Sequence, residues 1–152
     1  MVGQLNNDQI NRVLETQLIG RIGCGTQDRH YIFPVTYVFH EGSVYVHSKE
    51  GLKLKILSSN PNVCFQVDQI DNMNNWRSVL IWGKYEALNK EEEQVAALNI
   101  LRNRFEPFNV SETVLPDLSA GHESYRKESR AVAYRIRIIE KTGRYEKSSV
   151  KI

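Results

Sequence analysis

Ser48 and Lys53 lie on either side of Gly51, where the sequence changes from a strand pattern to a helical pattern. We therefore expect a helix to begin just after Gly51, with Lys53 in its first turn. A helix N-terminus carries partial positive charge and unpaired backbone N–H groups, so a lysine there costs roughly 0.3 to 1 kcal/mol unless an anion is near. A bound phosphate would remove that conflict, with the Ser48 hydroxyl and the helix amides as further donors. From the residues alone, a solvated helix surface explains Lys49, Lys53 and Lys55 equally well.

The composition indicates a single domain over residues 1–152, long enough to bury a sizeable core. The formal net charge is +2, far from the basic excess of a nucleic-acid-binding protein. The first residues lack a signal-peptide pattern and no apolar run could span a bilayer, so we expect a cytoplasmic protein without a membrane partner. Cys24 and Cys64 have no CxxC or adjacent histidine partner, and we expect two buried, reduced thiols.

The pattern of apolar and β-branched residues predicts a mainly β protein with six strands and few helices. Short turns connect the first three strands, which are expected to form an antiparallel meander. Gly83 interrupts a long strand as a bulge would, which favours a small closed or split β-barrel. The long segment 106–130 is expected to cover a site or a partner. The expected strands are residues 19–26, 31–39, 44–48, 63–67, 76–88 and 131–139, and the expected helices are residues 10–18 (capped by Asn7 or Asp8), 52–57 and 90–105.

Five short motifs occur in a distinctive order, namely GRIG, FPVTYV, VHS followed by EGLK, NPNVCF and WRSVLIWGKYEAL. This ordered set resembles the FMN-binding split-barrel proteins related to pyridoxamine 5'-phosphate oxidase, and most of all their short branch, which includes the nitroimidazole-resistance proteins. The resemblance covers residues 19–105, and the strand at 131–143, ending in a TGR turn, also fits. It implies a six-stranded antiparallel split β-barrel that forms a homodimer, with FMN in clefts at the subunit interface.

The resemblance also implies which positions contact the flavin. One group would hold the phosphate, a second would lie along the isoalloxazine ring, and a third would reach the flavin from the neighbouring subunit. These groups are Ser48 and Lys53, with His47 beside them; Pro34, Val35, Thr36 and Tyr37; and Trp76, Arg77 and Ser78.

The function that the resemblance implies is an FMN-dependent oxidoreductase acting on a small aromatic, nitro or quinone acceptor, with NAD(P)H or another reductant as electron donor. The flavin would carry the chemistry, so no side chain needs to act as a nucleophile. We identify no certain catalytic residue, and His47 is the candidate nearest the flavin. The oxidase itself has further arginine-bearing segments near its C-terminus, whereas this chain ends in TGRYEKSSVKI, so we do not expect pyridoxamine phosphate to be its substrate.

Three alternatives remain open from the sequence. A related split barrel could carry flavin or haem without turnover, with His40, His47 or His122 as an iron ligand. Aromatic residues beside lysines would also suit an RNA-binding barrel, although the net charge argues against a nucleic-acid partner. The aromatic rings of Tyr31 and Tyr37 could flank a flavin ring or simply pack together. No histidine spacing indicates a metal site.

Overall fold

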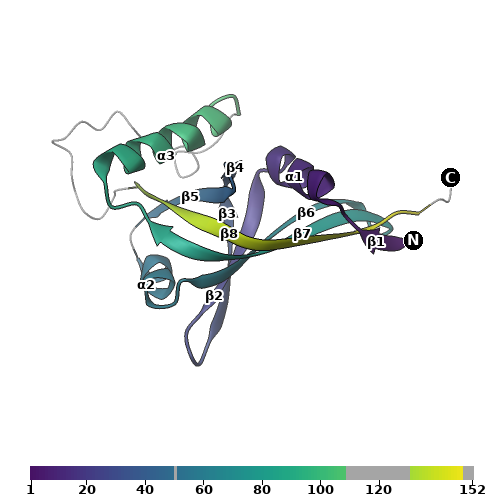
Figure 1. The fold of residues 1–152 in the computed structure, drawn as a ribbon, viewed down its shortest axis with the longest axis horizontal. Helices are drawn as coiled ribbons and strands as arrows, with labels where there is room; N and C mark the ends of the chain where they lie inside the picture. The colour runs from purple at the N-terminus through teal and green to yellow at the C-terminus, as the bar shows by residue number, and fades with distance from the viewer. Residues whose placement is uncertain (50, 109–130, 149–152) are drawn as a thin grey trace.

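The computed structural model describes residues 1–49, 51–108 and 131–148, and it is a mostly antiparallel β structure with three flanking helices (Figure 1). Within those ranges the strands form one sheet in the order β3-β2-β6-β7-β8-β5-β4, and β1 pairs with β8 outside this path. The predicted mainly β, split-barrel fold class is confirmed. The elements are β1 (Val2–Gln4), α1 (Asn7–Thr16), β2 (Ile19–Gly25), β3 (His30–Thr36), β4 (Val38–His40), β5 (Ser43–Lys49), α2 (Leu52–Ser59), β6 (Asn62–Asn72), β7 (Asn75–Ala87), α3 (Glu91–Phe105) and β8 (Ala131–Glu146).

The predicted three-stranded meander is wrong, because the expected strand at 31–39 divides at Tyr37 into β3 and β4. These two strands pair with β2 and β5, respectively, and lie at opposite ends of the strand order. Tyr37 is 1% exposed, and its backbone N–H and side-chain hydroxyl donate to the carbonyls of Leu18 and Leu14. Because its ring enters the core, the chain turns a corner there instead of continuing as one strand.

The last strand is longer than predicted. β8 extends to Glu146 and includes Gly143, so the expected TGR turn is instead strand that pairs with β7. The predicted bulge at Gly83 is confirmed by a register shift between Trp82 and Gly83, which leaves one extra residue on β8. A side chain at Gly83 would lie 2.6 Å from the carbonyl oxygen of Arg137, which explains why only glycine fits at this bend.

The helices begin close to their predicted positions. The cap of α1 is Asn6 and not Asn7 or Asp8, and it forms a capping box with Gln9. α3 is held to the sheet by Gln94, whose side chain makes three hydrogen bonds with the backbone of Leu88 and Ala133. These bonds satisfy polar groups at the edge of the helix–sheet contact.

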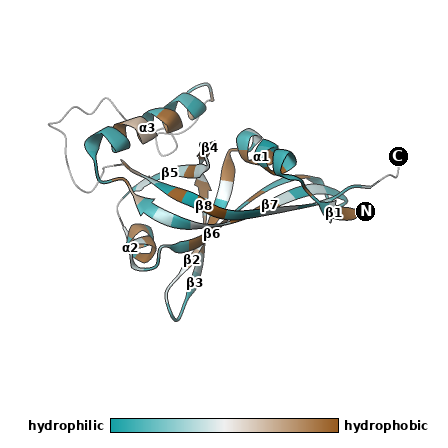
Figure 2. Cartoon of the chain, in the orientation of Figure 1, coloured by the Kyte–Doolittle hydropathy of each residue, from teal (hydrophilic) through white to brown (hydrophobic). Residues whose placement is uncertain are grey.

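Two apolar clusters hold the structure together. The larger lies inside the barrel and includes Val13 and Leu14 of α1 with the strand residues Phe65 and Ile81. The smaller lies between α3 and the outer side of β8, and it includes the fully buried Leu101. Figure 2 shows hydrophobic and hydrophilic residues together along α3, as expected for a helix with one buried face.

Neither cysteine forms a disulfide, as predicted, but only Cys24 is buried and Cys64 is half-buried. Most of the segment 106–130, expected to act as a cover, lies outside the described residues, as does His122. No helix in the described ranges is long and apolar enough to cross a membrane.

Candidate functional site

The start of α2 has features expected of an anion site. Gly51 is the N-cap of α2 and has no side chain to bond the free amides, and the first turn contains no acidic residue. Neither the N-cap residue nor the first turn of α2 therefore supplies a carboxylate to accept hydrogen bonds from the first backbone N–H groups. An incoming anion would supply the missing negative charge.

Lys53 points toward the protein and not into open water. The side chain is half-buried, and its ammonium nitrogen lies 5.0 Å from the centroid of the Phe33 ring. Burial lowers the pKa of Lys53, and the nearby Cys24 thiol opposes this shift to a smaller degree. The cation–π contact compensates only part of the lost hydration, so a bound anion would stabilise the charged lysine.

Ser48 contributes a hydroxyl oxygen that is buried and has no hydrogen-bond partner among the described residues. The Tyr134 hydroxyl, which our sequence reasoning missed, shares both properties, and burial raises its pKa. The register Val46↔Tyr134 and Ser48↔Val132 places the two residues diagonally on one face of β5 and β8. A buried polar group without a partner costs about 1 to 3 kcal/mol, so both hydroxyls suit a site that receives a polar group.

His47 is separated from Ser48 by the alternation of side chains along β5. It pairs with Ala133, which packs in the cluster beneath α3. The structure therefore places His47 and Ser48 on opposite faces of the strand, and does not bring His47 to the interior side of the anion site.

The segment from Pro34 to Tyr37 divides in the same way. Val35 and Tyr37 belong to the core, whereas Pro34 and Thr36 lie on the opposite face. Within the described residues β3 pairs only with β2. Tyr37 donates its backbone N–H to the carbonyl of Leu18, on the β2 side. Backbone N–H groups alternate in direction along an antiparallel strand, so the N–H of Thr36 points to the free edge. The nitrogen of Pro34 points the same way, which is where a strand tolerates a proline. Thr36 thus offers a backbone donor to a ligand, while the Tyr37 ring does not.

Trp76, Arg77 and Ser78 lie at the far end of β7, away from α2 (Figure 1). Lys53 lies near Cys24 of β2. The neighbouring residue Gly23 pairs with Cys64 of β6, which in turn pairs with Trp82 of β7, so Lys53 is close to the Trp82 end of β7. Trp82 and Trp76 are six residues apart on β7, or about 20 Å along a strand. One chain therefore does not bring these residues to Lys53.

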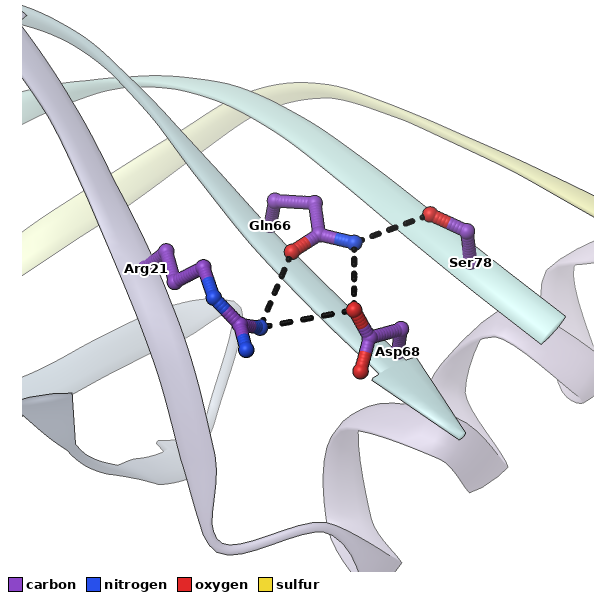
Figure 3. Close-up of polar contacts among 4 residues, drawn as sticks. All are labelled: Arg21, Gln66, Asp68 and Ser78. Atoms are coloured by element: carbon purple, nitrogen blue, oxygen red, sulfur yellow. Dashed lines mark hydrogen bonds and ion pairs between the residues drawn. The ribbon is translucent and has the colours of Figure 1, made fainter. Parts of the chain in front are cut away.

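The three residues also face different sides of the sheet. Arg77 and Trp76 help to line a small pocket of about 120 Å³, and the Trp76 indole donates to Glu146 over 3.0 Å. Ser78 lies on the face opposite Arg77 and accepts a hydrogen bond from Gln66 over 3.1 Å (Figure 3).

Pro34, Thr36 and Ser78 belong to what we call the open face, the side of β3, β2, β6 and β7 that points away from the core. Large apolar side chains are exposed on it, with exposed fractions from 41% for Trp82 to 73% for Ile32. The residues that define the open face are Ile19, Arg21, Gly23, Ile32, Pro34, Thr36, Cys64, Gln66, Asp68, Ser78, Leu80 and Trp82.

A metal centre is not apparent in the part of the chain that the structure describes, where no three His, Cys, Asp or Glu side chains come together. His40 is exposed and lies 3.8 Å from Glu41.

The strand order and the flanking helices define the class of antiparallel split β-barrels, and the start of α2 adds a candidate anion site. The chain belongs to the pyridoxamine 5'-phosphate oxidase family, whose model matches residues 6–145. The family predicted from the motif order is thus confirmed.

Solved structures of similar fold include flavin-binding proteins. An FAD-binding protein from Mesorhizobium loti is 26% identical, with a TM-score of 0.73 and coverage of 95% of this chain and 98% of the other. A proposed 5-nitroimidazole antibiotic resistance protein from Bacteroides thetaiotaomicron is 18% identical, with a TM-score of 0.71 and coverage of 95% and 87%. The latter likeness shows the fold alone.

A curated relative, an uncharacterized protein from Rhizobium meliloti (strain 1021), is 29% identical over 84 residues. This match covers 55% of the chain and 56% of the length of the relative.

Proposed function

We propose that this protein is an FMN-binding oxidoreductase that reduces a small aromatic, nitro or quinone-type acceptor. The observation that carries the proposal is the anion site at α2 in a member of this family. There the half-buried Lys53 and the Ser48 hydroxyl, which has no hydrogen-bond partner among the described residues, lie at a helix start where Gly51 provides no side-chain cap. FMN would supply transfer of electrons or hydride at its ring.

Each group of residues would have a separate role toward the flavin. Lys53, Ser48 and the first amides of α2 would hold the phosphate, since charge-assisted hydrogen bonds are the strongest available there. The backbone N–H of Thr36 at the free edge of β3 would bond a polar atom of the ring. Pro34 would pack against the ring, while Val35 and Tyr37 would support this strand from the core.

FMN is preferred over FAD because the anion site provides for one phosphate group. Flavin-binding relatives nevertheless include FAD-binding proteins, among them one from Mycobacterium smegmatis that is 20% identical, with a TM-score of 0.64 and coverage of 95% of this chain and 98% of the other. Binding of both flavins should therefore be measured side by side.

The test of activity is reduction of the FMN-loaded protein by NADH or NADPH, followed through loss of the oxidised flavin absorbance. We expect one of the two to reduce the bound flavin, and a nitro or quinone acceptor then to restore the absorbance faster than it does for free FMN. A protein that binds FMN but shows neither step at rates above free FMN would be a carrier of the same fold, and the enzyme proposal would fail.

We further propose that two copies of the chain form a homodimer through the open face. Ile19, Ile32 and Trp82 are all exposed to water on this face, and large apolar side chains exposed on one face are typical of an interface. A partner would also explain how Trp76 and Ser78 could approach a flavin that they do not reach within their own chain.

The dimer is tested by measuring molar mass in solution for the wild type and for Trp82→Glu. We expect a dimeric wild type and a shift toward monomer in the variant, because a buried unpaired carboxylate is costly. Val95→Glu on α3 is the control, since Val95 is similarly exposed but lies away from the open face. A wild type that stays monomeric at micromolar concentration would contradict the dimer.

A further inference from the structure

A polar network lies at the centre of the open face, and Arg21 is its cation (Figure 3). Arg21 Nη1 lies 3.4 Å from Gln66 Oε1 and 3.3 Å from Asp68 Oδ2. The Gln66 Nε2 donates to Asp68 Oδ2 and to Ser78 Oγ, each over 3.1 Å. These two bonds fix the Gln66 amide, so that its carbonyl oxygen faces Arg21 and limits the rotation of the guanidinium.

The charge of Arg21 is only partly compensated. Both Nη1 contacts are longer than the 2.7 to 2.9 Å or so that is usual for a charge-assisted hydrogen bond. Within the described residues, Nε and Nη2 make no hydrogen bond, and the side chain is 46% exposed against 27% for Asp68. Arg21 therefore presents unused donors and residual positive charge to any occupant of the open face.

Arg21 is also a cation on the same face of the sheet as Pro34 and Thr36, which lie in the strand expected to contact the flavin ring. It pairs with Pro34 across the β2–β3 ladder, and neighbouring strands are about 4.8 Å apart. Arg77, which the resemblance implies would reach the flavin from the neighbouring subunit, lies on the opposite face of the sheet in its own chain. A flavin beside Pro34 and Thr36 would thus meet Arg21 of the same chain.

We propose that Arg21, oriented by Gln66 and Asp68, sets the reduction potential of the bound flavin. This inference rests on the proposed function. Arg21 would offset the negative charge that a flavin gains when it takes up two electrons and one proton, and Asp68 would weaken that effect. Arg21 is in this sense a tuning residue that favours the reduced form.

The experiment compares midpoint potentials of the FMN-loaded wild type, Arg21→Gln, Asp68→Asn and Arg12→Gln, with dithionite as reductant and a reference dye. In Arg21→Gln the affinity for reduced FMN should fall about tenfold relative to that for oxidised FMN. For a two-electron couple this lowers the midpoint potential by about 30 mV. Asp68→Asn should shift the potential in the opposite direction. Arg12→Gln removes the same charge from an exposed position on α1 and should leave it unchanged.

A second readout is the dissociation constant of oxidised FMN, which should change less than about threefold in Arg21→Gln, because the charge acts on the reduced form. Equal potentials in Arg21→Gln and Arg12→Gln, with FMN bound to both, would overturn the role of Arg21 and leave the proposed function standing. A large loss of oxidised affinity with an unchanged potential would also overturn it. A wild type that binds neither FMN nor FAD would overturn both proposals.

Discussion

Replacing Lys53 with alanine is expected to weaken FMN binding by about 1.5 to 3 kcal/mol, or roughly 10- to 150-fold in Kd. The lost interaction is a charge-assisted hydrogen bond between the ammonium group and the flavin phosphate. Burial already lowers the pKa of Lys53, so the wild-type affinity should also decline as pH rises through that lowered pKa. Titration of flavin-free protein, followed by quenching of flavin fluorescence, measures both effects.

Lys55→Ala is the matched control, because Lys55 is exposed and lies two residues further along the same helix. It removes the same charge from a position outside the anion site, and its Kd should stay within about twofold of the wild type. Equal losses in the two variants would show only a general attraction of lysines for an anion. An unchanged Kd in Lys53→Ala would remove this residue from the site.

Phe65→Ala is expected to destabilise the fold by about 3 to 5 kcal/mol, the usual cost of removing a fully buried aromatic ring. Phe65 is 0% exposed and packs edge-on against Tyr37, with ring centroids 5.1 Å apart. A side chain at Gly20 would overlap with the Phe65 ring, so the ring fills the space that Gly20 leaves on the core side of β2. Urea unfolding with a common slope measures the change.

Val95→Ala is the control for that experiment, since Val95 is 49% exposed on α3 and should change stability by no more than about 0.5 kcal/mol. A loss below about 1 kcal/mol for Phe65→Ala would mean that the contact between Phe65 and Tyr37 does not hold the barrel corner together.

Local patterns predicted most of the elements. The strands from 19, 44, 63 and 76 and the helices after Gly51 and Lys90 follow from apolar periodicity and from turn residues within each segment. The alternation along β6 also identifies Val63, Phe65 and Val67 as its core side. These features depend on neighbours in sequence, which is why they could be predicted.

The corner at Tyr37 depends on distant contacts and could not be predicted in the same way. The run YIFPVTYVF does not show that the chain turns at Tyr37, because its residues favour strands on both sides of that position, with Pro34 as the one exception. The division follows from the Tyr37 hydroxyl reaching Leu14 in α1, 23 residues earlier. Likewise, the strand β1 exists because β8 extends far enough to pair with it.

The candidate site shows the same limit. The spacing of Ser48, Gly51 and Lys53 predicted the anion site, because all three lie within one turn of chain. Arg21 and Tyr134 were missed, since their surroundings come from other strands, namely β6 for Arg21 and β5 for Tyr134. A register between strands would have been needed to identify either one.

The most direct test of the account is titration of the purified, flavin-free protein with FMN, with thermal unfolding measured at each concentration. We expect saturable binding of one FMN per chain and a rise in Tm, since a ligand at 100 times its Kd stabilises the folded state by about 2.7 kcal/mol. Absence of saturable binding with both FMN and FAD, and an unchanged Tm, would contradict the assignment of the Lys53 and Ser48 site to a flavin.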